Sequence, residues 1–380
     1  MNTDNKSSVR SNKAVWLPAK QAQLVIDTAP YTYPRENEIV VQNRAVAINP
    51  NDWLTQSMGS IVLPWTKYPF VLGSDVAGVV VEVGSAVSRF KVGDRVLGHA
   101  VAADKKRNNA SEGGFQDYTV LLENMAAPIP ASLSYENAVV LPLGLSTAAS
   151  GLFQKDQLAL QHPSAQAKPT GQVLLIWGGS TSVGSNAIQL AVAAGYEVIT
   201  TASPKNFNYV KDLGAAEVFD YRSSTAVRDI IASLKGRQIA GALALGVGSA
   251  EACLEIVHAS QGVKAIALAT PSVSFENAPL GSGRLLWLIP TMARLIGVNV
   301  ALMAKARMRG IRVKYIFGTS LMENEVSRLI YRDFLPGALA KGSYVAVPAP
   351  LVFGHGLESI PAAVEAQKQG VSAKKLVVTL

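Results

Sequence analysis

Residues 173–190, VLLIWGGSTSVGSNAIQL, constrain the fold more than any other stretch of the chain. A run of apolar residues meets Gly178 and Gly179, and glycine tolerates the positive φ angles that a sharp turn requires. A helix is predicted from about Ser182, because apolar residues then recur on one face at helical spacing. Gly184 has no side chain and would let this helix approach the strand closely. The stretch therefore predicts a buried strand that turns abruptly into a helix.

A turn of this kind is a candidate anion site. The start of a helix presents unpaired N–H groups and the positive end of the helix dipole, as in the first crossover of dinucleotide-binding folds. The usual G-x-G-x-x-G fingerprint is broken here, because its three positions hold Gly179, Thr181 and Gly184. Hydroxyl groups of Ser180, Thr181 and Ser182 can donate to a phosphate instead. A glycine turn that binds nothing is the alternative, and the pattern that follows disfavours it.

Strand-like and helix-like segments alternate downstream of about residue 138. The strand candidates recur every 20 to 30 residues, at 172–177, 196–200, 216–221, 241–247 and 263–269, with a further candidate at 313–319. Such alternation predicts parallel βαβ units. Residues 14–137 instead show short β-branched runs separated by glycine turns, which is typical of an antiparallel β-rich unit.

We therefore expect an α/β protein with a doubly wound parallel sheet and a second, β-rich domain. The predicted boundaries are a flexible N-terminus over 1–11, a β-rich domain formed by 12–136 and 319–380, and a nucleotide-binding domain over 137–318.

The end of the second predicted strand favours one nicotinamide nucleotide over the other. Folds that bind NAD place an acidic residue there to hold the ribose 2′-hydroxyl. In this chain the strand runs into ASPKNF, where Ser203 and Lys205 can bind a 2′-phosphate. Tyr221, one strand later, can lie against the phosphorylated ribose with Arg222 beside it. NADPH is the predicted cofactor; the alternative is that Lys205 is an ordinary surface lysine.

Composition disfavours several classes of protein. The net charge is +8, but the basic residues do not form tracts with interleaved aromatic residues, so nucleic-acid binding is not expected. A single cysteine, Cys253, allows no disulfide framework and fits a cytoplasmic location. The first twelve residues lack the apolar core of a secretory signal. No metal site is expected, because the four histidines have no ligand spacing: His99, His162, His258 and His355.

Residues 285–304, LLWLIPTMARLIGVNVALMA, have the length of a membrane span. Polar or helix-perturbing residues interrupt the segment, namely Pro290, Arg294, Gly297 and Asn299. An arginine near the centre of a span is costly in lipid. We therefore predict a buried or pocket-lining helix, with a membrane-associated segment as the alternative.

The motifs together resemble the medium-chain dehydrogenase/reductase superfamily over nearly the whole chain. The motifs are INPNDW (48–53), LGSDVAGVVVEVGSAVSRFKVGDRVLG (72–98), GGFQDYTVL (113–121), LPLGLSTAASGLF (141–153), the glycine turn and the ending GVSAKKLVVTL (370–380). Within the superfamily the chain is similar to zinc-free quinone reductases and, more closely, to fungal trans-acting enoyl reductases of polyketide pathways. Zinc-dependent members carry a histidine–glutamate pair where this chain has Ser74 and Asp75.

The resemblance implies a Rossmann domain and a GroES-like domain, with NADPH in the cleft between them. It implies catalytic roles for Asn49, Asp52 and Thr147, although turn formation and helix capping are the alternative explanation for these three residues and for Ser146. The residues that it implies around the cofactor are Ser146, Ser180, Thr181, Ser182, Val183, Ser203, Lys205, Asn206, Tyr221, Leu268, Val371 and Ser372.

The implied activity is zinc-free, NADPH-dependent transfer of hydride to an activated C=C bond of an enoyl or enone compound in a secondary-metabolite pathway. The substrate would be a small apolar unsaturated carbonyl compound, free or bound to a carrier protein, and the enzyme a monomer or homodimer. Related reductases often carry a lysine or tyrosine where Trp53 and Leu54 stand, and neither of these can protonate an enolate. Water, another group or the more distant Tyr68 would then supply the proton. A quinone oxidoreductase is one alternative, and a non-redox pathway partner or cyclase-like member is another.

Overall fold

The computed structural model describes residues 10–276, 278 and 284–380, so most of the expected flexible N-terminus lies outside the described residues. The strands predicted after residue 138 form one seven-stranded sheet, and every pairing in it is parallel. The strand order is β11-β10-β9-β12-β14-β15, with the short β13 beside β12. The bounds are β9 (Gln172–Trp177), β10 (Glu197–Ala202), β11 (Glu217–Asp220), β12 (Gln238–Ala244), β13 (Gln261–Gly262), β14 (Ala265–Leu268) and β15 (Arg312–Tyr315).

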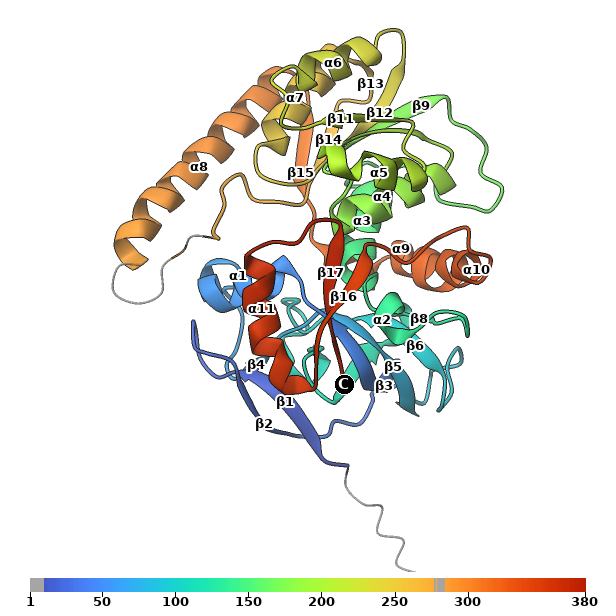
Figure 1. Cartoon of the computed structure of the whole chain (residues 1–380), viewed down its shortest axis with the longest axis vertical. Helices are drawn as coiled ribbons and strands as arrows, with labels where there is room; N and C mark the ends of the chain where they lie inside the picture. Colours follow the sequence, from blue (N-terminus) through green and yellow to red (C-terminus); the bar gives the residue numbers. More distant parts are fainter. Residues whose placement is uncertain (1–9, 277, 279–283) are drawn as a thin grey trace, which may run out of the picture.

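This order runs outward in both directions from the central pair β9 and β12, as in a doubly wound nucleotide-binding sheet. Helices connect successive strands and cover the sheet (Figure 1). They are α4 (Ser182–Ala193), α5 (Phe207–Asp212), α6 (Ala226–Ser233) and α7 (Ser249–Ala259). The predicted fold class is confirmed.

A second seven-stranded sheet forms the core of the β-rich part, in the order β16-β17-β3-β5-β6-β8, with β7 beside β3. Only β16 and β17 pair in parallel; the other pairings are antiparallel. The bounds are β3 (Glu38–Ala47), β5 (Asp75–Val83), β6 (Arg95–His99), β7 (Tyr118–Leu122), β8 (Ala126–Pro128), β16 (Ala349–His355) and β17 (Lys374–Thr379). A small antiparallel sheet contains β1 (Asn12–Leu17), β2 (Val25–Ala29) and β4 (Phe70–Val71). The end of the chain thus returns to complete a sheet that the first hundred residues begin.

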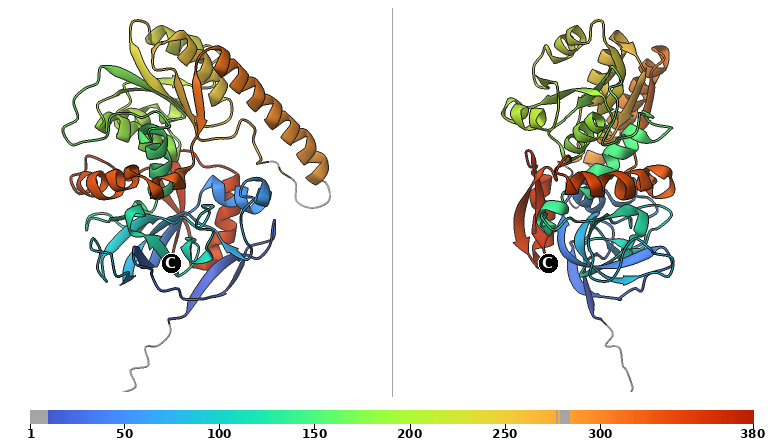
Figure 2. Two further views of the ribbon diagram at one scale, coloured as in Figure 1. Left: turned by 180° about the vertical axis from the view of Figure 1, so that it is seen from behind. Right: turned by 90° about the vertical axis from the view of Figure 1, so that its right-hand side faces the viewer.

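Helix α3 (Pro142–Phe153) lies between the two sheets (Figures 1 and 2). Its Leu145, Ala148 and Leu152 are fully buried in one apolar cluster that reaches Ile176 of β9 and Leu97 of β6. This apolar cluster is continuous from the parallel sheet through α3 to the β-rich sheet, so the two parts of the protein share one core. The other α-helices of the described residues are α1 (Pro50–Met58), α2 (Tyr135–Ala138), α8 (Arg284–Met308), α9 (Glu325–Arg328), α10 (Leu335–Ala340) and α11 (Ile360–Lys368), and a π-helical turn spans Leu329–Phe334.

The helix expected over 285–304 forms as α8, but the prediction that it is buried is wrong. Only 6% of its most apolar window is buried, and among its described side chains only Leu302 and Ala306 are fully covered. By length and composition α8 is the one helix in the described part of the chain that could cross a membrane. The apolar composition suggested burial, but only the contacts of the folded chain show which side of a helix is covered. Figure 1 shows α8 as a long rod along the edge of the molecule.

Candidate functional site

The glycine turn between β9 and α4 has the expected geometry. Gly178 has a φ of 92°, and its N–H donates to Thr201 Oγ1 at 2.9 Å. A Cβ at Gly184 would lie 2.3 Å from the carbonyl oxygen of Gly178 and 2.8 Å from Gly179 Cα. Both contacts are with backbone, which cannot move aside cheaply. The close approach predicted from Gly184 is therefore confirmed, and the N-terminus of α4 opens directly onto the turn.

The hydroxyl groups at this turn have different surroundings. Thr181 caps α4: its Oγ1 accepts from the N–H of Gly184 at 3.0 Å and donates to the oxygen of Gly178 at 2.8 Å. Its hydroxyl thus stabilises the turn itself. Ser182 Oγ is buried near Gly144 of α3, without a hydrogen-bond partner among the described residues. Ser180 and Val183 are half-buried at the same turn. An orphaned hydroxyl beside a free helix N-terminus fits a polar ligand such as a phosphate.

The loop after β10 meets the loop before β17. Asn206 Nδ2 donates to Ser203 Oγ at 3.4 Å and to Ser372 Oγ at 3.2 Å, across 166 positions of the chain in the second case. Lys205 lies between Ser203 and Asn206 in the sequence. Its side chain is exposed and has no ion pair in the part of the chain that the structure describes. The structure thus brings three of the predicted cofactor residues together at the carboxyl end of a parallel strand, where ligands of such sheets bind.

Tyr221 follows the next strand, β11, and 47% of its surface is exposed. The guanidinium of Arg222 lies 5.7 Å from the centre of its ring, and Arg222 also pairs with Asp220 at 3.4 Å. Asp220, the acidic residue at the end of this strand, is therefore already paired with Arg222. An exposed aromatic face and a guanidinium on this edge are compatible with a phosphorylated ribose.

Thr147 and Ser146 lie in α3 but have different environments. Thr147 is half-buried, its Oγ1 donates to the oxygen of Leu143 at 2.8 Å, and the loop after β15 covers it closely at Gly318. Ser146 is fully buried and shares a 2.7 Å hydrogen bond with Tyr331 Oη. The hydroxyl of Ser146 is thus occupied inside the protein. Leu268 is buried at the end of β14, whereas Val371 is exposed.

Asn49 and Asp52 form a capping box at the start of α1. The N–H of Asn49 donates to Asp52 Oδ2 at 2.7 Å, and the N–H of Gly73 donates to Asp52 Oδ1 at 3.3 Å. The helix-capping role that the sequence left open for Asn49 and Asp52 is therefore present in the structure. Both side chains are buried, and their catalytic role remains a prediction.

A buried charge pair that the sequence interpretation missed lies beside this box. Lys375 Nζ lies 2.9 Å from Asp75 Oδ2, and both side chains are almost completely buried. Asp75 also accepts from Asn49 Nδ2 at 2.8 Å and from the N–H of Leu143 at 2.6 Å, while Lys375 donates to Asn49 Oδ1. Asp75 thus joins β5 to α1, α3 and β17. A lysine inside the apolar strand KKLVVTL was the signal in the sequence, since a lysine seldom lies in a buried strand without an acidic partner.

His99 ends β6 directly opposite Asp75 in the ladder. The imidazole is fully buried, and neither ring nitrogen has a hydrogen-bond partner among the described residues. Burial lowers the pKa of His99 to about 4, so the ring is neutral near pH 7. A neutral His99 adds no charge to the pair formed by Asp75 and Lys375.

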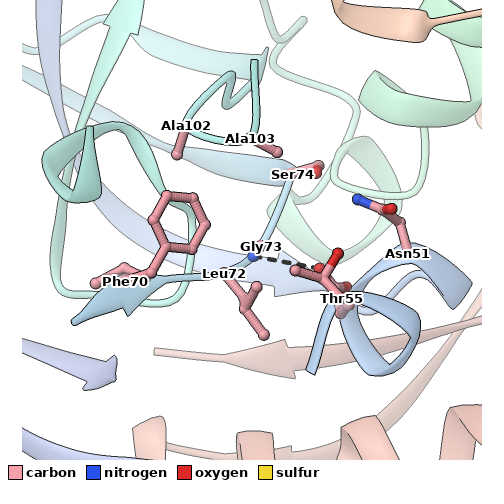
Figure 3. Close-up of a pocket in the computed structure, with 10 residues that line it drawn as sticks. Asn51, Thr55, Phe70, Leu72, Gly73, Ser74, Ala102 and Ala103 are labelled. Carbon is pink, nitrogen blue, oxygen red and sulfur yellow. Dashed lines mark hydrogen bonds between the residues drawn. The ribbon is translucent and has the colours of Figure 1, made fainter. Parts of the chain in front are cut away.

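A small hollow lies between α1 and the segment that leads into β5 (Figure 3). Asn51 and Thr55 line it from α1, and Ser74 and Ala103 line it from the other side. Asp52 also contributes to the lining. This places a titratable carboxyl group at the wall of a hollow in the β-rich part.

Burial raises the pKa of Asp52 to about 7, and the nearby Asp75 adds to the rise. Between about pH 4 and pH 7 the folded protein therefore keeps this proton while the unfolded chain loses it. The contribution of Asp52 to the free energy of unfolding then falls as the pH rises, by at most about 1.4 kcal/mol per pH unit. From about pH 5 to pH 7, the Asp52→Asn variant should gain stability relative to the wild type, by up to about 2.7 kcal/mol. Denaturant unfolding of both proteins at several pH values measures this difference, and a difference independent of pH would contradict the raised pKa.

Trp53 and Leu54, which stand where related reductases often carry a lysine or tyrosine, lie in apolar surroundings. Trp53 is 7% exposed and packs in an apolar cluster, with Leu54 at its border. Tyr68 packs against the same cluster, and its buried hydroxyl has no hydrogen-bond partner in the described chain. Burial raises the pKa of Tyr68, which keeps the phenol protonated. Within the described ranges, no group of three His, Cys, Asp or Glu side chains gathers as metal ligands; the absence of zinc remains a prediction.

Comparison with known proteins agrees with this geometry. Residues 35–131 match the alcohol dehydrogenase GroES-like domain family. The dehydrogenase pigH of Monascus ruber is 56% identical over 97% of this chain and 100% of its own length. The trans-enoyl reductase himH of Aspergillus japonicus is 37% identical, with 97% of each chain covered. The crystal structure of the CurK enoyl reductase superposes with a TM-score of 0.70 at 19% identity, covering 97% of this chain and 99% of the other.

The fold and the relatives together define an oxidoreductase that combines a parallel α/β sheet with a GroES-like β-rich part, and its reductase homologues use nicotinamide cofactors. The chain belongs to the medium-chain dehydrogenase/reductase superfamily, among relatives that include fungal dehydrogenases and trans-enoyl reductases. The resemblance inferred from the motifs is thereby confirmed.

Proposed function

We propose that the chain is an NADPH-dependent, zinc-free reductase that adds hydride to an activated C=C bond of an enoyl or enone compound in a secondary-metabolite pathway. The observation that carries the proposal is the cluster of Ser203, Asn206 and Ser372 at the end of β10, with the unpaired Lys205 beside it. A lysine and hydroxyls in place of an acid favour a 2′-phosphate. The trans-enoyl reductase relative supports the class of substrate.

The residues divide into three groups, one each around the pyrophosphate, the phosphorylated ribose and the nicotinamide of the cofactor. The N-terminus of α4, with Ser180, Ser182 and Val183, would hold the pyrophosphate, while Ser203, Lys205, Asn206 and Tyr221 would hold the phosphorylated ribose. When bound, NADPH supplies the hydride. Thr147, Leu268 and Val371 would position the nicotinamide. Ser372 would join the residues at the phosphorylated ribose, because its Oγ accepts a hydrogen bond from Asn206. Ser146 would act through α3, because its hydroxyl is bonded to Tyr331.

Proton delivery in this proposal falls to water. Trp53 and Leu54 carry no acidic proton, and the hydroxyl of Tyr68 is buried in the apolar cluster of Trp53. Both carboxyl oxygens of Asp52 accept backbone hydrogen bonds, so this residue would hold α1 in place beside the substrate. Asn49 would also hold the start of α1 in place, because its side chain donates a hydrogen bond to Asp75 and accepts one from Lys375.

The activity test is a screen of NADPH oxidation against α,β-unsaturated carbonyl compounds and quinones, with nucleotide titrations in parallel. Oxidation with enones but not with quinones supports the proposal. Oxidation with quinones alone would favour a quinone oxidoreductase. Tight NADPH binding without turnover of any compound would favour a non-redox, cyclase-like member. This alternative is considered because neither Trp53 nor Leu54 can protonate an enolate.

The substrate in this proposal is small and apolar, free or bound to a carrier protein, and the reaction takes place in the cytoplasm. A monomer or a homodimer is compatible with the sheet, because β15 lies at its edge. Edge strands pair readily with a second chain unless charges discourage them, and β15 carries Arg312 and Lys314.

Replacing Lys205 with alanine should weaken NADPH binding at least about tenfold and leave NADH binding nearly unchanged. One charge-assisted contact contributes roughly 1.5–3 kcal/mol, and tenfold corresponds to about 1.4 kcal/mol. Only NADPH carries the phosphate that would lose its partner. Fluorescence titrations of both nucleotides with both proteins measure the difference.

Lys211→Ala is the matched control, because Lys211 is an exposed lysine of the following helix α5. It should leave both affinities unchanged. An equal loss for NADPH and NADH in Lys205→Ala would show that Lys205 is an ordinary surface lysine.

A further inference from the structure

Helix α8 presents an unusually apolar face to solvent. Leu286, Ile289, Ile296 and Val300 are each exposed by 59% or more. At 100° per residue these four side chains fall within one arc of the helix. The residues between them on that side are small or apolar, namely Pro290, Ala293, Gly297, Ala301 and Ala304. We call the side formed by these nine residues the outer face of α8. It runs for about 28 Å along the helix, and exposed apolar surfaces of this extent mark interaction sites.

The opposite side of α8 is held by the protein. Trp287 packs edge-on against Phe275 with their ring centres 6.4 Å apart, and Asn299 Oδ1 accepts from Ser272 and from Tyr315 at 2.9 Å each. Leu302 packs into the core beneath α7 and β14. The helix is therefore anchored on its inner side at these three positions, and it runs along the edge of the molecule (Figures 1 and 2).

The charges around the outer face have one sign. Residues 277–322 contain seven lysines and arginines and no aspartate or glutamate. Arg309 and Lys314 pair with acids elsewhere in the protein. Arg294, Lys305 and Arg307 are exposed and have no ion pair among the described residues. By helical geometry Arg294 and Lys305 lie along one margin of the outer face, and Arg307 lies just beyond its C-terminal end; long basic side chains at these positions can reach outward.

We propose that α8 docks on an anionic lipid surface, with its outer face toward the acyl chains and these three basic residues at the headgroups. A helix in a membrane interface combines an apolar face with lysine and arginine at its borders. A second copy of the chain fits less well, because two such helices would bring basic margins together without an acidic partner. A transmembrane position would strip away the contacts of Trp287, Asn299 and Leu302. This surface is independent of the nucleotide site and of the proposed function.

The segment that leads into α8 packs beside helix α1. The segment that follows β14 contains the buried Val273, Phe275 and Ala278, which pack in the same apolar cluster as Trp53. This segment connects Leu268 to α8. Docking of α8 would therefore hold the apolar cluster that contains Trp53 of α1 near a lipid surface.

Co-sedimentation of the full chain with vesicles tests the proposal. Vesicles of phosphatidylcholine with about one-third phosphatidylserine should bind the protein, and vesicles of phosphatidylcholine alone should bind it at least about tenfold more weakly. The variant Ile296→Asp/Val300→Asp should lose binding to both kinds of vesicle. The matched control Val92→Asp/Val263→Asp adds the same two charges at exposed valines elsewhere and should bind as the wild type does.

A second variant separates the charges from the apolar face. Arg294→Gln/Lys305→Gln/Arg307→Gln keeps every apolar side chain and should lower the preference for phosphatidylserine by about fivefold for each charge removed. Thermal unfolding of each variant checks that the fold is retained. Failure of the folded wild type to bind either vesicle would overturn the proposal. So would a concentration-dependent dimer in light scattering that Ile296→Asp/Val300→Asp dissociates, since the outer face would then belong to a second copy.

Discussion

Asp75→Asn should lower the free energy of unfolding by about 3–5 kcal/mol, the usual cost of removing one partner from a buried ion pair. The substitution leaves Lys375 buried without a negative partner, 2.9 Å from the site of the lost charge. It also weakens the acceptor of the N–H groups from Asn49 and from Leu143, which hold α1 and α3 against β5. Urea unfolding followed by fluorescence and by circular dichroism measures the loss.

Two variants test whether the loss comes from the uncompensated charge. The double variant Asp75→Leu/Lys375→Met removes both charges and should recover part of the stability, because apolar replacements of a buried pair are often tolerated. Lys155→Met breaks an exposed pair with Glu325 and should change stability by less than about 1 kcal/mol. If Asp75→Asn and Lys155→Met had equal effects, the buried network would not be important for the fold.

Gly184→Ala should weaken binding of either nicotinamide nucleotide by about 100-fold, on the scale expected for a displacement of about 1 Å in a binding element. The new Cβ would lie 2.3 Å from a backbone oxygen of the turn, so α4 must move away from β9. Its N-terminal N–H groups would then no longer face the place where the pyrophosphate is expected. Calorimetric titration of NADPH and NADH measures the loss.

Gly337→Ala is the matched control for this change. Gly337 lies inside helix α10, and a Cβ there would meet nothing within 4 Å. The control should bind both nucleotides as the wild type does and should be slightly more stable, since alanine favours helices. Unchanged nucleotide affinity in a folded Gly184→Ala protein would mean that the turn is not the pyrophosphate site.

The sequence by itself determined the parallel sheet, the glycine turn and the helix after it. These features depend on residues within a few positions of one another: apolar runs form strands, Gly178 permits the turn and Thr181 caps the helix. The motifs between residues 48 and 153 also identified the superfamily correctly, because their order and spacing survive in the chain. Local patterns of this kind can be recognised before any tertiary contact is known.

Only the tertiary structure decided which distant residues meet and which surfaces stay open. Asn206 and Ser372 meet across 166 positions, and Lys375 reaches Asn49 across 326. The apolar composition of α8 suggested burial, yet its outer face is exposed because none of the described elements packs against it. Burial and long-range hydrogen bonds depend on how separate elements pack together. That packing brings segments that are far apart in the chain together at the site, and no short stretch of sequence predicts these contacts.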